Sequence, residues 1–262
     1  MIIEKEEIVN NLKVHFRLCG DPANRPLVFL SAWGAHFGKF KLVNATDIVI
    51  ENFASHFYII SIEHPGLMRS EIPPVGYQFK DYAETVSTVL SSLNVEKVII
   101  LGNSYGGAIA TAFAKLFPQK VERLILVDSV VSKDFEQTKY VFENNKKLYL
   151  RLKSKHGTNV LKKFITWFYL GVPFDYLKNE DSEKRAAMVK WAGKRDLDVD
   201  YSELKVPVLL LWGKNDLKIH PINYAREIAK RLKNGKLVEY GGNVGTIYKK
   251  PGMIKKLILE NL

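Results

Sequence analysis

The sequence contains a single cysteine, Cys19, so no disulfide bond can form within the chain. It also lacks any apolar run approaching the roughly 18 residues that a membrane-spanning helix needs. The first seven residues, Met1–Glu7, carry acidic side chains where a secretory signal has an apolar core. We therefore expect a cytoplasmic protein with no membrane association.

Extremes of composition are absent as well. Hydrophobic residues make up 47% and charged residues 26% of the 262 positions, which is the ordinary balance of a globular protein. This balance excludes a disordered tail, a collagen and a coiled coil. The length suits one large domain, or one domain that carries a modest insert.

The net charge of +11 is unevenly distributed. Residues 1–131 have a net charge of −1, residues 132–200 of +5 and residues 201–262 of +7. The basic half has no helix-turn-helix pattern, zinc-ligand spacing or aromatic RNA-binding signature, so we expect no nucleic-acid partner. The sequence also lacks a metal-ligand cluster, a phosphate loop and a dinucleotide fingerprint, and we therefore expect no metal and no cofactor.

Apolar runs alternate with helical patterns along most of the chain. The predicted strands are a hairpin around Asn10-Asn11, followed by short runs at residues 27–30, 57–60, 98–101, 124–127, 208–212 and 236–240. The predicted helices cover residues 82–93, 108–117, 221–232 and 251–259. This order predicts an α/β fold with a doubly wound, mostly parallel, eight-stranded sheet flanked by helices.

The alternation stops between about Val131 and Asp200, where the sequence has no convincing strand and predicts helices. The segment leaves the sheet after the strand that ends at Val127, at the carboxyl edge where such sheets bind ligands. We therefore expect a core of residues 1–131 and 201–262, with residues 132–200 inserted as a helical cap, or lid. The many aromatic side chains of this cap either line an apolar pocket or pack the cap onto the sheet.

The most informative motif is Gly102-Asn103-Ser104-Tyr105-Gly106, a G-x-S-x-G pattern directly after a predicted strand and before a predicted helix. Glycines at both ends of the motif permit a tight turn that lifts the Ser104 side chain above the sheet. The amino terminus of the following helix can stabilise negative charge nearby. Ser104 is therefore the candidate nucleophile, and the alternative is a serine that merely caps the helix.

With this motif the chain resembles the α/β-hydrolase superfamily, in its single-chain serine hydrolase form with a helical cap. Four further segments carry the resemblance, namely Ser31-Ala32-Trp33-Gly34, Glu63-His64-Pro65-Gly66 with Arg69-Ser70, Val206 to Asp216, and Lys250-Pro251. The resemblance implies a carboxylesterase-like enzyme with a catalytic triad, acting on a small ester or a related acyl substrate.

A serine hydroxyl needs a base to take its proton, and that base needs a carboxylate to orient it. Asp216 follows a predicted parallel strand and so lies at the same edge of the sheet as Ser104, which makes it the candidate acid. Asp128, which follows the strand ending at Val127, is the alternative. The backbone N–H groups of Trp33 and Tyr105 are the expected oxyanion donors.

The base is missing from its expected place. The family places a histidine just past the last strand, but here Asn243 or Val244 occupies that position, and no histidine follows His220. An asparagine cannot accept a proton near pH 7, and a valine has no polar group in its side chain. We expect Ser104 to react poorly with a fluorophosphonate probe unless another histidine replaces the missing one.

The sequence leaves three interpretations open. The first is a serine hydrolase whose histidine has been lost, naturally or by engineered inactivation, and the second is a protein that uses the pocket to bind or sense a small ligand. The third is an enzyme with a rearranged base. Three histidines could approach the rim of the site, His36, His64 and His220, whereas the remaining three, His15, His56 and His156, belong to other parts of the predicted fold.

Overall fold

The computed structural model describes residues 1–32, 45–67, 69–130, 200–217 and 220–262. The predicted cap, residues 132–200, therefore lies outside the described residues except for Asp200. In the part of the chain that is described, no helix is long and apolar enough to cross a membrane.

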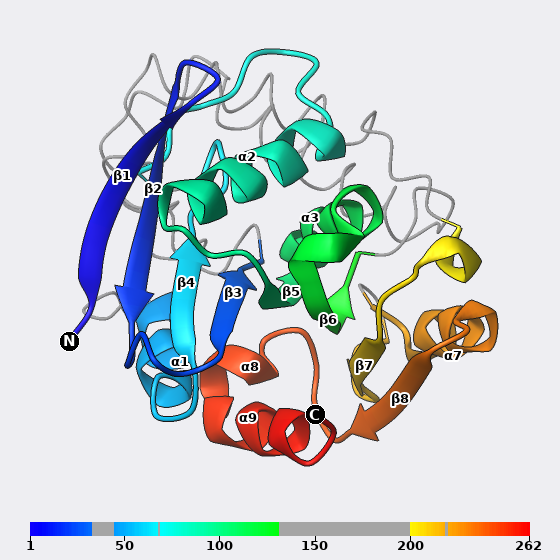
Figure 1. Cartoon of the computed structure of the whole chain (residues 1–262). Helices are drawn as coiled ribbons and strands as arrows, with labels where there is room; N and C mark the ends of the chain where they lie inside the picture. The colour runs from blue at the N-terminus through cyan, green and yellow to red at the C-terminus, as the bar shows by residue number, and fades with distance from the viewer. Residues whose placement is uncertain (33–44, 68, 131–199, 218–219) are drawn as a thin grey trace, which may run out of the picture.

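The core is one eight-stranded sheet with the order β1-β2-β4-β3-β5-β6-β7-β8 (Figure 1). The strands are β1 (Ile3–Val9), β2 (Leu12–Cys19), β3 (Pro26–Leu30), β4 (Tyr58–Ile62), β5 (Val98–Ser104), β6 (Val121–Ser129), β7 (Val208–Gly213) and β8 (Gly235–Tyr240). Strand β2 pairs antiparallel with β1 and β4, and all other pairs are parallel. The predicted fold class is thus confirmed, including the antiparallel hairpin at one edge.

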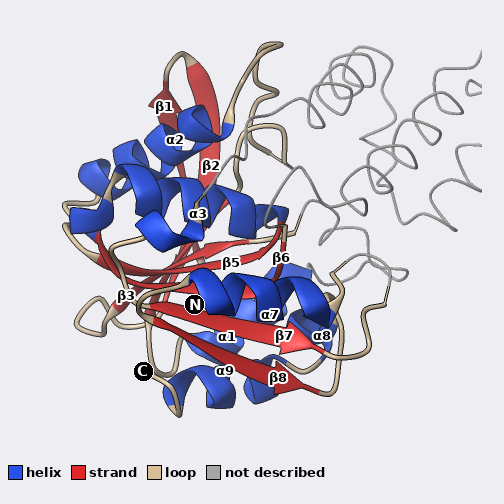
Figure 2. Ribbon diagram, turned by 90° about the vertical axis from the view of Figure 1, so that its right-hand side faces the viewer, coloured by secondary structure: helices blue, strands red, loops and turns tan. Residues whose placement is uncertain are grey.

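Helices cover both faces of the sheet (Figure 2). They are α1 (Ala45–Phe53), α2 (Phe79–Ser92), α3 (Tyr105–Leu116), α7 (Ile222–Arg231), α8 (Thr246–Lys249) and α9 (Pro251–Leu259), with short 3-10 turns at Pro118–Lys120 and Tyr201–Glu203. Apolar side chains of α2, α3 and α7 share one buried cluster with the sheet, and those of α1, α8 and α9 share the cluster on the opposite face.

Local sequence explains features at the edge and in the middle of the sheet. The hairpin turn consists of Asn10 and Asn11, with φ values of 50° and 61°, and asparagine tolerates this left-handed conformation better than most residues. In the middle of the sheet, β5 and β7 are buried along nearly their whole length, which explains their uninterrupted apolar runs. Helices α1 and α8 were not predicted.

Candidate active site

Ser104 lies on a sharp turn between β5 and α3. Its φ of 51° and ψ of −116° place a residue with a side chain in a region that usually favours glycine. Two glycines permit this turn, because a Cβ at Gly106 would lie 2.1 Å from the carbonyl oxygen of Leu30, and a Cβ at Gly102 would lie 2.4 Å from that of Gly106. The chain therefore packs backbone against backbone at this point, and the Ser104 side chain stays partly exposed.

The hydroxyl of Ser104 contacts the side chain of a histidine. Its Oγ lies 3.1 Å from Nε2 of His220, within hydrogen-bond distance. His220 follows β7 in the chain and is 3% exposed. Of the three histidines that the sequence placed near the rim, the structure brings His220 to the serine, whereas His36 lies outside the described residues.

Several contacts hold His220 in place. The indole Nε1 of Trp212, the penultimate residue of β7, donates a hydrogen bond of 2.8 Å to the backbone oxygen of His220. The two rings also meet edge to face, with centroids 6.3 Å apart. The backbone of Ser129 forms a hydrogen bond with the imidazole that favours its protonated form. The ring is thus fixed from β6 and from β7.

The surroundings keep this imidazole neutral. Burial lowers the pKa of His220 to about 4, although the negative charge of Asp216 and the hydrogen bond to Ser129 act in the opposite direction. Near pH 7 the ring is therefore uncharged and can accept a proton. Asp216 is itself 7% exposed and is close enough to His220 to affect its pKa.

Asp128, the alternative acid, bonds elsewhere. Its Oδ1 accepts a 2.7 Å hydrogen bond from the backbone N–H of Gly213, and its Oδ2 accepts one from the hydroxyl of Tyr240. Burial raises the pKa of Asp128 to about 7, these two hydrogen bonds lower it, and the charge of Asp216 raises it further. The carboxylate thus joins β6 to β7 and β8.

The position where a histidine was expected has a local structural role in this chain. The Oδ1 of Asn243 accepts a 3.1 Å hydrogen bond from the N–H of Gly245, which closes an Asx turn before α8. The carbonyl oxygen of Val244 accepts a 3.4 Å hydrogen bond from the amide of Asn103. The hydrogen bond described for the side chain of Ser104 goes to His220 and not to either of these residues.

A chain of hydrogen bonds also joins the turn at Ser104 to the end of β3. The hydroxyl of Tyr248 accepts a 2.9 Å hydrogen bond from the N–H of Ala32 and donates one of 2.9 Å to Oδ1 of Asn103. Ala32 directly precedes Trp33, one of the two predicted oxyanion donors, which lies outside the described residues. The other predicted donor, Tyr105, is the first residue of α3.

His64 lies among aromatic rings. Its ring centroid is 5.8 Å from that of Tyr82 and 5.4 Å from that of Tyr105, and its side chain is 1% exposed. Phe79 packs on Tyr105 at 5.4 Å. His64 therefore contributes to the packing behind Tyr105.

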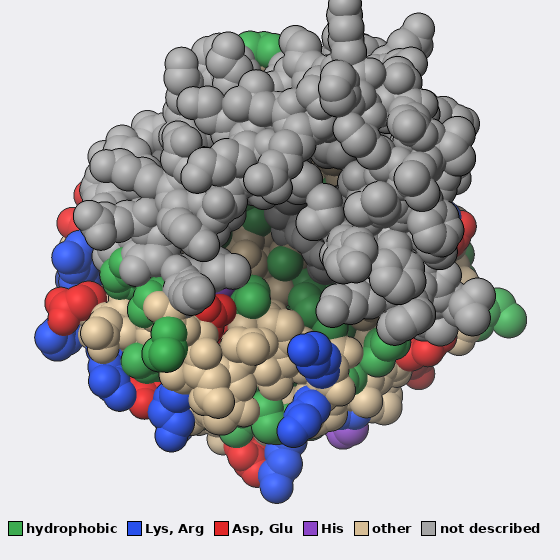
Figure 3. All heavy atoms as spheres, turned by 180° about the vertical axis from the view of Figure 1, so that it is seen from behind, with side chains coloured by type: hydrophobic (Ala, Val, Ile, Leu, Met, Phe, Trp, Pro, Cys, Tyr) green, Lys and Arg blue, Asp and Glu red, His purple; other side chains and the backbone are tan. Residues whose placement is uncertain are grey.

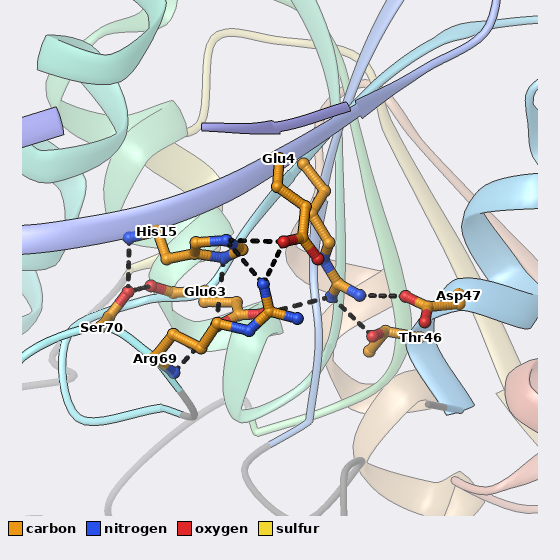
Figure 4. Close-up of polar contacts among 8 residues, drawn as sticks. Glu4, His15, Thr46, Asp47, Glu63, Arg69 and Ser70 are labelled. Carbon is orange, nitrogen blue, oxygen red and sulfur yellow. Dashed lines mark hydrogen bonds and ion pairs between the residues drawn. The ribbon is translucent and has the colours of Figure 1, made fainter. Parts of the chain in front are cut away.

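A second polar cluster, partly buried, lies at the edge formed by β1, β2 and β4 (Figure 4). Arg17, which is 2% exposed, pairs with Asp47 and lies 3.5 Å from Glu63. Nδ1 of His15 lies 3.4 Å from the same glutamate, and Arg69 pairs with Glu4. Burial alone would raise the pKa of Glu63, but the hydrogen bond with His15 and the charge of Arg17 outweigh it and lower the pKa.

This cluster has a structural function. The Glu63 to Ser70 segment is one of those that carry the resemblance to the α/β-hydrolase superfamily. The hydroxyl of Ser70 donates a hydrogen bond to the backbone oxygen of Glu63 and accepts one of 2.9 Å from the N–H of His15. Arg17 adds a 2.7 Å hydrogen bond to Thr46 of α1. The cluster thus ties the loop after β4 to the hairpin and to the first helix.

Within the described residues, no group of three or more His, Cys, Asp or Glu side chains is arranged to hold a metal ion. On the face shown in Figure 3, basic side chains are interspersed with acidic ones. Three of the basic residues after position 220 form ion pairs, namely Arg226 with Glu239, Lys230 with Glu227, and Lys256 with Glu260.

Comparison with known proteins finds relatives that share this fold. The model of the family described as alpha/beta hydrolase fold matches residues 25–161. Among curated proteins, the chain is 27% identical over 254 residues to the "Putative carbamate hydrolase RutD" of Serratia proteamaculans, covering 89% of this chain and 90% of that protein. It is 25% identical to the AB hydrolase superfamily protein YisY of Bacillus subtilis, covering 90% and 91%.

Solved structures show the same fold at low identity. A thermophilic esterase from Thermogutta terrifontis superposes with a TM-score of 0.74 at 18% identity, covering 98% of this chain and 97% of the esterase. A hydrolase from Pseudomonas aeruginosa gives a TM-score of 0.74 at 17% identity, with coverage of 98% and 97%.

Proposed function

The chain belongs to the α/β-hydrolase fold family, and from this premise we propose that it is a serine hydrolase with a rearranged base, acting on small esters or related acyl compounds. Ser104 is the nucleophile, His220 the general base and Asp216 the acid. The observation that carries the proposal is the 3.1 Å contact between Ser104 Oγ and His220 Nε2.

The first half of the reaction forms an acyl-enzyme. The Ser104 hydroxyl gives its proton to Nε2 of His220 as Oγ attacks the carbonyl carbon of the ester. Negative charge develops on the carbonyl oxygen, where the N–H of Tyr105 and the amino terminus of α3 stabilise it. The imidazolium then gives its proton to the departing alkoxide, and the alcohol leaves.

The second half regenerates the enzyme. A water molecule gives a proton to His220 and attacks the acyl carbon, and the imidazolium then returns that proton to Oγ of Ser104 as the acid product is released. In both halves the negative charge of Asp216 stabilises the transient imidazolium, consistent with its effect on the pKa of His220. Asn243 takes no part in the chemistry, because its side chain is engaged by Gly245.

Hydrolysis of p-nitrophenyl acetate tests this proposal. We expect the wild-type protein to hydrolyse the ester, Ser104→Ala to lose the activity, and Ser55→Ala, which changes an exposed serine near the end of α1, to keep it. Equal rates for wild type and Ser104→Ala would contradict the proposal. A wild-type protein without activity towards a series of acetyl to octanoyl esters would favour the binding or sensing interpretation.

A further inference from the structure

Strand β6 contains a bulge beside the nucleophile. In the pairing of β5 with β6, Asn103 lies opposite Val127 but Ser104 lies opposite Ser129, so that Asp128 is an extra residue. Asp128 also has a φ of 41°, a left-handed conformation that is uncommon for a residue with a side chain. Bulges of this kind redirect side chains next to active sites.

The two residues that follow Asp128 contact different parts of the candidate site. The N–H of Val130 donates a 2.9 Å hydrogen bond to the backbone oxygen of Ser104. The backbone of Ser129 bonds to the ring of His220. Both members of the Ser104–His220 pair are therefore held from one short segment of chain.

Asp128 fixes that segment in place. Its carboxylate is fully buried and takes hydrogen bonds from the N–H of Gly213 and from the hydroxyl of Tyr240. Gly213 is the last residue of β7, three positions before Asp216, and Tyr240 is the last residue of β8. The side chain thus ties the carboxyl ends of three strands together, although burying a carboxylate is costly.

We propose that Asp128 is a positioning residue, which together with Tyr240 holds the β6 bulge and thereby aligns the His220 imidazole with Ser104. It acts through the backbone of Ser129 and Gly213 and does not touch the reacting atoms. The inference rests on the proposed function only in taking Ser104 and His220 as the reacting pair.

Tyr240→Phe is the sharpest test, because it removes one donor to Asp128 and leaves the ring and the carboxylate in place. Tyr201→Phe is the matched control, since it removes a buried phenol hydroxyl that bonds to Thr111, away from Ser104. We measure kcat and KM for p-nitrophenyl acetate in both variants. In addition, we record the imidazole nitrogen resonances of His220 as a function of pH, assigned with His220→Ala.

We expect Tyr240→Phe to lower kcat at least tenfold with little change in KM. The variant should also shift the His220 resonances and move the pKa that they report towards the ordinary histidine value. Tyr201→Phe should leave all of these unchanged. Wild-type kcat and wild-type His220 resonances in Tyr240→Phe would overturn the inference. If the wild-type protein hydrolyses no ester but the resonances still shift, the proposed function fails while the positioning role stands.

Discussion

Ser104 and His220 meet across the carboxyl edge of the sheet, with Oγ and Nε2 3.1 Å apart, although 115 residues separate them in the chain. Ser104 is the last residue of β5, and His220 lies in the segment that follows β7. In this chain the histidine that contacts the serine therefore comes from the same loop as Asp216, and not from the end of β8.

The first prediction concerns His220 itself. Replacing it with alanine should lower kcat/KM for p-nitrophenyl acetate by about 10² to 10⁴, the usual contribution of a positioned general base. The control is His56→Ala, which changes an exposed histidine just before β4. Equal losses in the two variants would mean that His220 has no special role.

The second prediction concerns pH. Because burial lowers the pKa of His220 to about 4, the neutral, proton-accepting ring persists well below pH 6. We expect kcat/KM to be flat from pH 7 to about 5 and to fall as the pH decreases through about 4. Asp216→Asn should lower the rate and move this acid limb to still lower pH, because the carboxylate raises the pKa of the imidazole. An acid limb at the ordinary histidine pKa would contradict the assignment.

The third prediction separates the rearranged base from a lost one. If the histidine had simply been lost from its usual place, Asn243→His should restore the rate by about 10² to 10⁴. We expect no such gain, because His220 already contacts the serine and Asn243 instead closes the turn to Gly245. Val244→His provides the second position to test, and a large increase in either variant would count against His220.

The fourth prediction concerns stability. Arg17→Met should lower the free energy of unfolding by about 3–5 kcal/mol, because it leaves the buried carboxylate of Glu63 without this cation. Arg25→Met is the matched control, since Arg25 pairs with Glu122 at the surface and such exposed pairs contribute about 0–1 kcal/mol. Urea denaturation measures both, and similar losses would show that the buried cluster contributes no more than a surface pair.

The local part of this architecture could be predicted from the sequence. The buried strands and the turn at Ser104 each depend on residues adjacent in the chain, so periodicity and glycine spacing were sufficient to find them. Helix α8 was missed because four residues are too few to show a helical period. The cap and Trp33 remain predictions, because they lie outside the described residues.

The choice among the histidines depends on tertiary structure. The sequence placed His36, His64 and His220 near one edge, but only packing determines which ring reaches the serine. The hydrogen bond from Trp212 to the backbone of His220 and the bulge at Asp128 decide it, and neither has a sequence signature. The one local signal was that His220 follows the candidate acid Asp216 by four residues.

The most direct test of the account is the labelling of Ser104 by a fluorophosphonate at neutral pH, followed by intact-mass measurement and peptide mapping. With His220 as a working base, the wild-type protein should become labelled stoichiometrically at Ser104, and His220→Ala should react far more slowly. An unreactive Ser104 in the wild-type protein, or equal labelling rates in the two proteins, would contradict the central claim.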